Sequence, residues 1–172
     1  MTALRTCFTI LAIFFSAPIL AQKATVLKGD GLNKLSILEG KWKAENQAGS
    51  GDSTSAVFAC HFSENKNFLV CDQMINHEGH QTNNLSIYSY DSLNHYKLTL
   101  VGIPGIEPFS IPAITTGDSL IYPGSHLENG IKVYNRTLNV FLNNAKYEFF
   151  IQSSNDNIHW TTSLSGTTEK IK

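Results

Sequence analysis

The sequence of 172 residues has few charged side chains and no basic cluster. Its 13 lysine and arginine residues and 14 aspartate and glutamate residues are scattered along the chain, which gives a formal net charge of −1. A nucleic-acid-binding surface needs a concentration of positive charge that neutralises phosphates. We therefore expect no nucleic-acid partner.

Catalytic signatures are also missing from the sequence. It has no Gly-x-Ser-x-Gly motif, no glycine-rich phosphate loop and no pair of carboxylates with catalytic spacing. His61 and Asp72 fall diagonally on one face of a predicted hairpin and could relay protons, but such a pair is more often a surface ion pair of small energetic value. We expect no enzymatic activity, and we assign no catalytic residue and no cofactor.

Long hydrophobic runs are limited to the N-terminus. Arg5 precedes an uncharged stretch from Thr6 to Ala21, and Gln22 and Lys23 follow it. This pattern predicts a signal peptide over residues 1–21 and a secreted or periplasmic protein. The apolar centre is shorter than the roughly 20 residues of a membrane-spanning helix, so we expect no membrane span.

Cysteine is rare, and removal of Cys7 with the signal peptide would leave only Cys60 and Cys71. An even number of cysteines in an oxidising compartment favours a disulfide, whereas a zinc site needs four ligands. The segment CHFSENKNFLVC (60–71) predicts a hairpin in which the two cysteines face each other across the strands. A four-residue loop, ENKN, would make them a non-hydrogen-bonded pair, the position that best accepts a disulfide.

The remainder of the chain alternates short β-branched and aromatic stretches with turn sequences such as HEGH (77–80) and SSNDN (153–157). This spacing is typical of an all-β sandwich or barrel. A single short helix is predicted in DGLNKLSILEG (30–40), with Asp30 as its cap and Gly40 at its end. The predicted strands are 40–46, 55–62, 68–76, 83–90, 95–101, 108–114, 118–122, 130–142, 146–153 and 158–170.

Three segments carry a resemblance to a known family. LSILEGKW (35–42) resembles the helical turn and first strand of lipocalin-like barrels, while IYSYDSLNHYKLTLVG (87–102) and FIQSSNDNIHW (150–160) resemble later landmarks of an uncharacterised family of small secreted or periplasmic calycin-type proteins. Ser89 departs from the usual glycine of that family. Ala44 replaces a glycine of the related haem-binding barrels, which argues against haem.

The resemblance implies an up-and-down antiparallel lipocalin-like barrel with a short N-terminal helix, and we expect it to have about 8–10 strands. The domain would span residues 32–172, after an N-terminal extension over 22–31. The family implies an internal cavity for a small, apolar ligand and no established catalytic residues. Fold analogy alone does not determine function.

Aromatic residues are the candidates for the barrel interior. Alternation along the predicted strands selects seven potential ligand-binding residues: Trp42, Phe58, Tyr88, Phe109, Tyr134, Phe149 and Trp160. If they leave a cavity, the protein binds a small hydrophobic ligand; if they fill the barrel, its function lies on the surface. The proline-rich segment 101–114, with Ile103 and Ile106, is predicted to form the rim of the barrel.

His77 and His80 flank a predicted turn closely enough to share a metal ion. They lack the helical spacing of the His-Glu-x-x-His zinc motif and need a third ligand. A solvent-exposed hairpin tip accounts for both histidines, so we assign no metal site.

Overall fold

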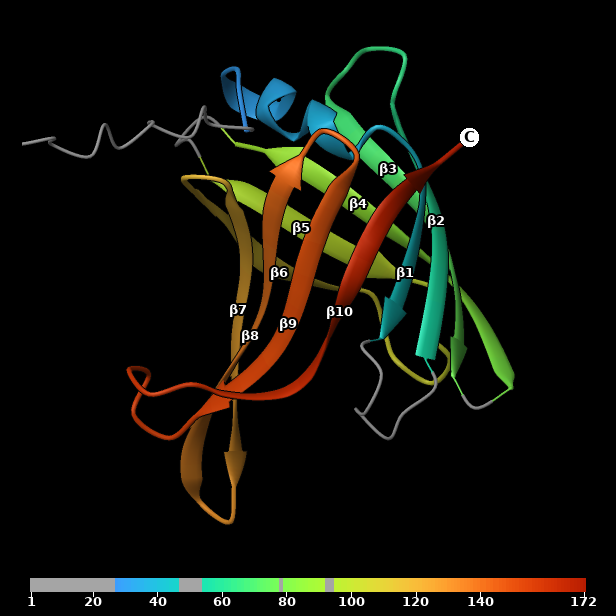
Figure 1. Ribbon diagram of the computed structural model, residues 1–172. Helices are drawn as coiled ribbons and strands as arrows, with labels where there is room; N and C mark the ends of the chain where they lie inside the picture. The colour runs from blue at the N-terminus through green and yellow to red at the C-terminus, as the bar shows by residue number, and fades with distance from the viewer. Residues whose placement is uncertain (1–26, 47–53, 78, 92–94) are drawn as a thin grey trace, which may run out of the picture.

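The computed structural model describes residues 27–46, 54–77, 79–91 and 95–172. Ten antiparallel strands close into a barrel, and a short 3-10 helix, η1 (Gly31–Leu38), lies at one end (Figure 1). The predicted signal peptide and residues 22–26 lie outside the described residues. The strands are β1 (Gly40–Asn46), β2 (Thr54–Phe62), β3 (Phe68–His77), β4 (His80–Tyr90), β5 (Tyr96–Val101), β6 (Phe109–Thr116), β7 (Ser119–Glu128), β8 (Ile131–Asn143), β9 (Lys146–Ser154) and β10 (Thr161–Ile171).

The strand order is up-and-down: each strand pairs with the next, and β1 pairs with β10 to close the barrel. This confirms the predicted all-β barrel, and each of the ten predicted strands corresponds to one observed strand. At the closing ladder, Asn46 lies opposite Gly166. A Cβ atom at Gly166 would overlap the Glu45 carbonyl oxygen and the Phe149 ring, so a residue without a side chain is needed there.

The helix covers one end of the barrel with its apolar side chains. Leu32, Leu35 and Leu38 are buried in the core, as their spacing predicts. Trp42 follows on β1, is fully buried and stacks against Phe58 with ring centroids 6.3 Å apart. The prediction of a side-chain cap was wrong, because Asp30 makes no capping hydrogen bond.

The first predicted hairpin has the expected register. Cys60 and Cys71 are direct cross-strand partners, joined by a disulfide with their Cα atoms 4.0 Å apart. The Ser63 N–H donates to the Phe68 carbonyl at 2.9 Å and thereby closes a four-residue loop. Hydrogen-bonded and non-hydrogen-bonded pairs alternate from this point, so the cysteines form a non-hydrogen-bonded pair, where the Cα atoms approach most closely.

The contact between β6 and β7 is the shortest ladder of the barrel. It consists of three pairs, the last being Ile114 opposite Ile121, and within the described residues β6 and β7 are not paired beyond that point. We call this line the β6–β7 seam. The prediction ended this strand at residue 122, whereas β7 continues through Pro123 to Glu128. The strand continues because β7 remains paired with β8 there, and proline is tolerated at a strand edge.

Candidate functional site

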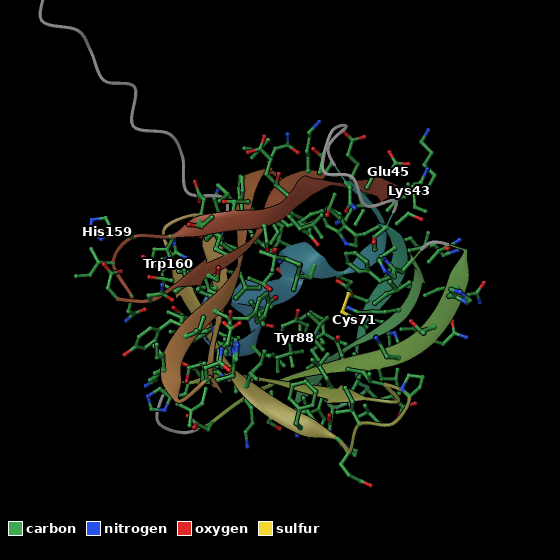
Figure 2. The ribbon with its side chains drawn as sticks, turned by 90° about the horizontal axis from the view of Figure 1, so that it is seen from below. Lys43, Glu45, Cys71, Tyr88, His159 and Trp160 are labelled. Atoms are coloured by element: carbon green, nitrogen blue, oxygen red, sulfur yellow. A yellow bond between two sulfur atoms is a disulfide. The ribbon has the colours of Figure 1, made fainter. Side chains whose placement is uncertain are left out.

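The barrel encloses a cavity rather than a filled core. Its inner chamber, of about 360 Å³, is bounded by Leu38 at the helix-covered end and by the Cys60–Cys71 disulfide on one wall. Figure 2, a view from below, shows Cys71 and Tyr88 toward the centre of the ring of strands. Ile111 and Tyr122 line this chamber from the two sides of the β6–β7 seam.

A second chamber inside the barrel, of about 280 Å³, reaches the opposite end, and we call it the outer chamber. It extends to Asn46 and Thr54, at the strand ends farthest from the helix. The two chambers adjoin inside the barrel, because they share a girdle of side chains. This girdle comprises Phe58, Gln73, Ile75, Thr137, Asn139 and Tyr147.

The lining of both chambers is uncharged. Among the described residues, no lysine, arginine, histidine, aspartate or glutamate lines either chamber. Polar groups are nevertheless present: Gln73 and Asn139 supply amides, while Thr137 and Tyr147 supply hydroxyls. The cavity therefore offers apolar contacts and neutral hydrogen-bonding groups, and its described lining holds no counter-ion for a charged ligand.

Two tyrosines form the polar part of the inner chamber. The hydroxyl oxygens of Tyr88 and Tyr122 lie 2.7 Å apart and share a hydrogen bond. The two residues are 6% and 8% exposed. Burial raises the pKa of Tyr88 to about 12 and also raises the pKa of Tyr122 well above its ordinary value. Both hydroxyls consequently keep their hydrogens at neutral pH.

Four of the seven predicted aromatic residues lie in or against the core. Tyr88 lines the inner chamber, Phe149 lines the outer chamber, and Phe58 lines both. Trp42 is buried in the core but lines neither chamber. Trp42 therefore closes the end of the barrel, and the other three side chains form walls of the cavity.

Phe109, the first residue of β6, lies opposite Leu100 on the inward face of the sheet, but it is 40% exposed and lines neither chamber. The interior placement of Tyr134 and Trp160 was wrong. The Lys132 ammonium lies over the Tyr134 ring at 4.7 Å, and the Arg136 guanidinium lies over the Trp160 ring at 4.0 Å. Figure 2 shows Trp160 at the periphery of the ring of strands.

The error on β8 has a physical reason. The inward residues of its central part are Thr137, Asn139 and Phe141, so Tyr134 falls on the outer face. Because Thr137 and Asn139 are polar, this part of the sequence lacks the regular apolar–polar alternation that indicates which face of a strand is buried.

Four cavity residues were missed by the sequence analysis: Tyr122, Tyr147, Gln73 and Asn139. Tyr147 could have been found, because it precedes Phe149 by two positions and shares its face.

The histidine pair at the β3–β4 turn has no metal-binding geometry among the described residues. His77 and His80 are cross-strand partners, and the Nδ1 atom of His77 lies 2.7 Å from the Thr54 hydroxyl oxygen. No group of three or more potential ligands is found in the described part of the chain. Glu78, a possible third ligand, lies outside it.

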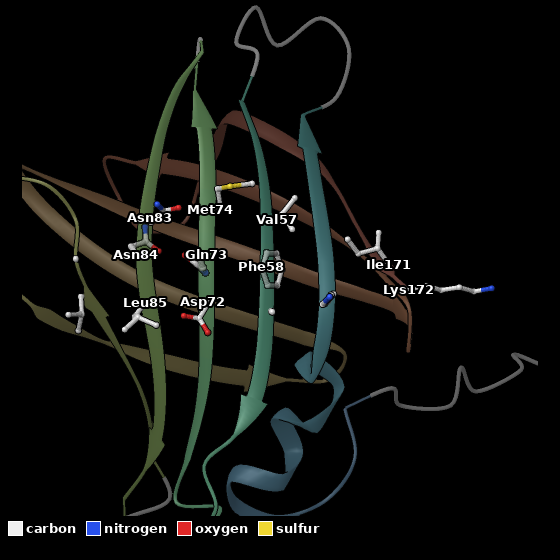
Figure 3. A pocket seen from close by; sticks show the side chains of 14 residues that line it. Val57, Phe58, Asp72, Gln73, Met74, Asn83, Asn84, Leu85, Ile171 and Lys172 are labelled. Atoms are coloured by element: carbon white, nitrogen blue, oxygen red, sulfur yellow. The ribbon is translucent and has the colours of Figure 1, made fainter.

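A depression on the outer surface lies across β1 to β4 (Figure 3). Its volume is about 650 Å³, and Val57, Met74 and Leu85 contribute apolar walls. Lys41 and Asp72 also border it. These side chains point away from the barrel interior, so this outer groove is separate from the cavity.

The comparison with known proteins does not extend the family resemblance. No family model matches the chain, and no curated protein matches it. The ten-stranded antiparallel barrel is consistent with a lipocalin-like fold without identifying a family. In the residues that the structure describes, no helix is long and apolar enough to cross a membrane.

Proposed function

We propose that the protein binds an uncharged small molecule with a largely apolar body inside the barrel. The observation that carries this proposal is the pair of adjoining chambers whose described lining has no charged side chain. Ligand cavities of a few hundred cubic ångströms with mostly apolar walls and a few polar groups are typical of small-molecule sites.

The lining favours neutral ligands over fatty acids and other anions. A carboxylate moved into this cavity would lose its hydration without gaining a cationic partner, at a cost of several kcal/mol. Phe58 and Ile75 suit an apolar body, and the amides of Gln73 and Asn139 suit neutral polar substituents. This refines the prediction of an apolar ligand, because the middle of the cavity is partly polar.

We further propose that the protein acts outside the cytoplasm and without catalysis. The N-terminal sequence supports export, and the Cys60–Cys71 disulfide supports an oxidising compartment. The resemblance to lipocalin-like secreted proteins supports ligand carriage. The alternative function, that of a surface-interaction protein with a solid barrel, is less well supported because the barrel interior contains a chamber.

Two related fluorescent probes test the proposal. N-phenylnaphthylamine is neutral, whereas anilinonaphthalene sulfonate carries the same aromatic groups and a negative charge. We expect the neutral probe to bind with enhanced emission and the anion to bind about hundredfold more weakly or not at all, since an unpaired charge costs several kcal/mol. Equal binding of the anion would contradict an uncharged site.

A matched pair of variants separates the cavity from the outer groove. Ala56→Trp fills the outer chamber, whereas Ala59→Trp places the same side chain on the outer face of the same strand. Binding should be lost in Ala56→Trp and retained in Ala59→Trp, with circular dichroism confirming that both variants are folded. The reverse result would assign the binding to the surface and overturn the proposal.

A further inference from the structure

The inner chamber has a hydrogen-bond donor that the protein itself leaves unused. Two phenol hydroxyls contain two hydrogens, and the bond between Tyr88 and Tyr122 uses one of them. Within the described residues, no acceptor takes up the second hydrogen. Both side chains are more than nine-tenths buried and line the chamber, so this donor is a buried group in the chamber wall.

We propose that the Tyr88–Tyr122 pair recognises a carbonyl oxygen of the ligand, as found in ketones, aldehydes and esters. The inference rests on the proposed function and deepens it by naming a chemical group. A buried donor without an acceptor is unfavourable, so a ligand that supplies the acceptor gains affinity. The shared hydrogen bond polarises the accepting phenol and strengthens the bond that it donates.

A carbonyl fits the free hydrogen of the tyrosine pair because its oxygen only accepts hydrogen bonds. A ligand hydroxyl or primary amide would bring hydrogens of its own, each of which needs an acceptor elsewhere in the chamber. A carbonyl oxygen brings none. The walls beside the pair include Leu98, Leu100 and Ile111, which suit the apolar carbon skeleton on either side of a ketone or ester.

The test compares two probes that differ in one group. The first is a naphthyl ketone with a dimethylamino substituent, whose emission shifts to longer wavelength when its carbonyl accepts a hydrogen bond. The second has a methylene in place of the carbonyl. We expect the wild-type protein to bind the ketone about threefold to tenfold more tightly, in line with one net hydrogen bond, and to shift its emission.

The variants follow from the arrangement of the pair. Tyr88→Phe or Tyr122→Phe alone leaves one hydroxyl, which can still donate, so each single variant should retain part of the ketone preference. The double variant removes both hydroxyls and should bind the two probes equally. Because both partners of the hydrogen bond are replaced by groups of the same shape, the double variant is expected to fold. Tyr134→Phe, on the outer face, is the matched control and should behave as wild type.

The outcomes separate this inference from the proposed function. If the wild type binds both probes equally, or if the double variant keeps the ketone preference, the carbonyl inference is overturned while binding in the barrel stands. If neither probe binds the wild type, the proposed function fails and the inference fails with it.

Discussion

The indole Nε1 of Trp42 donates a hydrogen bond to the Leu38 carbonyl oxygen, with the nitrogen and oxygen 2.7 Å apart. This bond joins the last residue of the helix to the first strand and fixes the helix over the barrel end. The Tyr96 hydroxyl donates to the Gly31 carbonyl at 2.8 Å and holds the other end of the helix. The closed end of the cavity is thus fastened at two points.

Trp42→Ala should destabilise the protein by about 3–5 kcal/mol, because it removes a large buried side chain and leaves a cavity. Trp42→Phe should cost less, since it keeps an aromatic ring and loses the hydrogen bond to Leu38. Urea denaturation measures both free energies of unfolding. Equal losses in the two variants would show that packing by the ring contributes little.

Removal of the disulfide should lower the free energy of unfolding by about 3 kcal/mol, because the crosslink restricts the unfolded chain. The double variant Cys60→Ala, Cys71→Ala measures this effect by denaturation. Wild type treated with a reductant is the parallel test and should lose a similar amount. The double variant itself should not respond to the reductant, and a response there would trace the effect to another cause.

Gly166→Ala should destabilise the barrel by about 1–3 kcal/mol, because the added methyl group forces the Glu45 backbone and the Phe149 ring apart. Gly124→Ala is the matched control on β7, where a Cβ atom would have no neighbour within 4 Å. The control should be neutral within about 0.5 kcal/mol. Thermal melts that show equal shifts for the two variants would contradict the close packing at Gly166.

Stability should fall as the pH rises above 10. Burial raises the folded-state pKa of Tyr88 from 10.0 to about 12 and raises the pKa of Tyr122 as well. Between the unfolded and folded pKa values, the folded protein holds protons that the unfolded chain releases, so ionisation favours unfolding. Tyr88 alone should contribute a loss of about 2–3 kcal/mol by pH 12.

The pH effect is measured by urea denaturation at several pH values and by the absorbance of ionised tyrosine. Tyr88→Phe, Tyr122→Phe and their double variant should lessen the fall in stability, whereas Tyr134→Phe should not. If all tyrosines of the folded protein ionised near the ordinary tyrosine pKa of 10.0, the burial of Tyr88 and Tyr122 would be contradicted.

Local sequence rules predicted the strands well and the cavity only in part. The symmetry of CHFSENKNFLVC about residues 65 and 66 is sufficient for the hairpin register, because pairing in a short hairpin depends on its own turn. The phase of β8 depends instead on neighbouring strands, which turn Thr137 and Asn139 inward. Tyr122 meets Tyr88 only through the closed barrel, 34 residues away in the sequence, and no local pattern indicates such a contact.

The β6–β7 seam leaves two stretches of strand edge without a partner in the described structure, and such edges promote aggregation by pairing between molecules. Thr116 and Ser119 flank a two-residue turn and form a hydrogen-bonded pair. Every second residue from this pair, along β6 and along β7, therefore points its backbone N–H and C=O groups toward the other strand. Pro112 and Pro123 fall on this alternation, and neither has an N–H to donate. The β6–β7 seam is therefore protected against sheet extension from one molecule to the next.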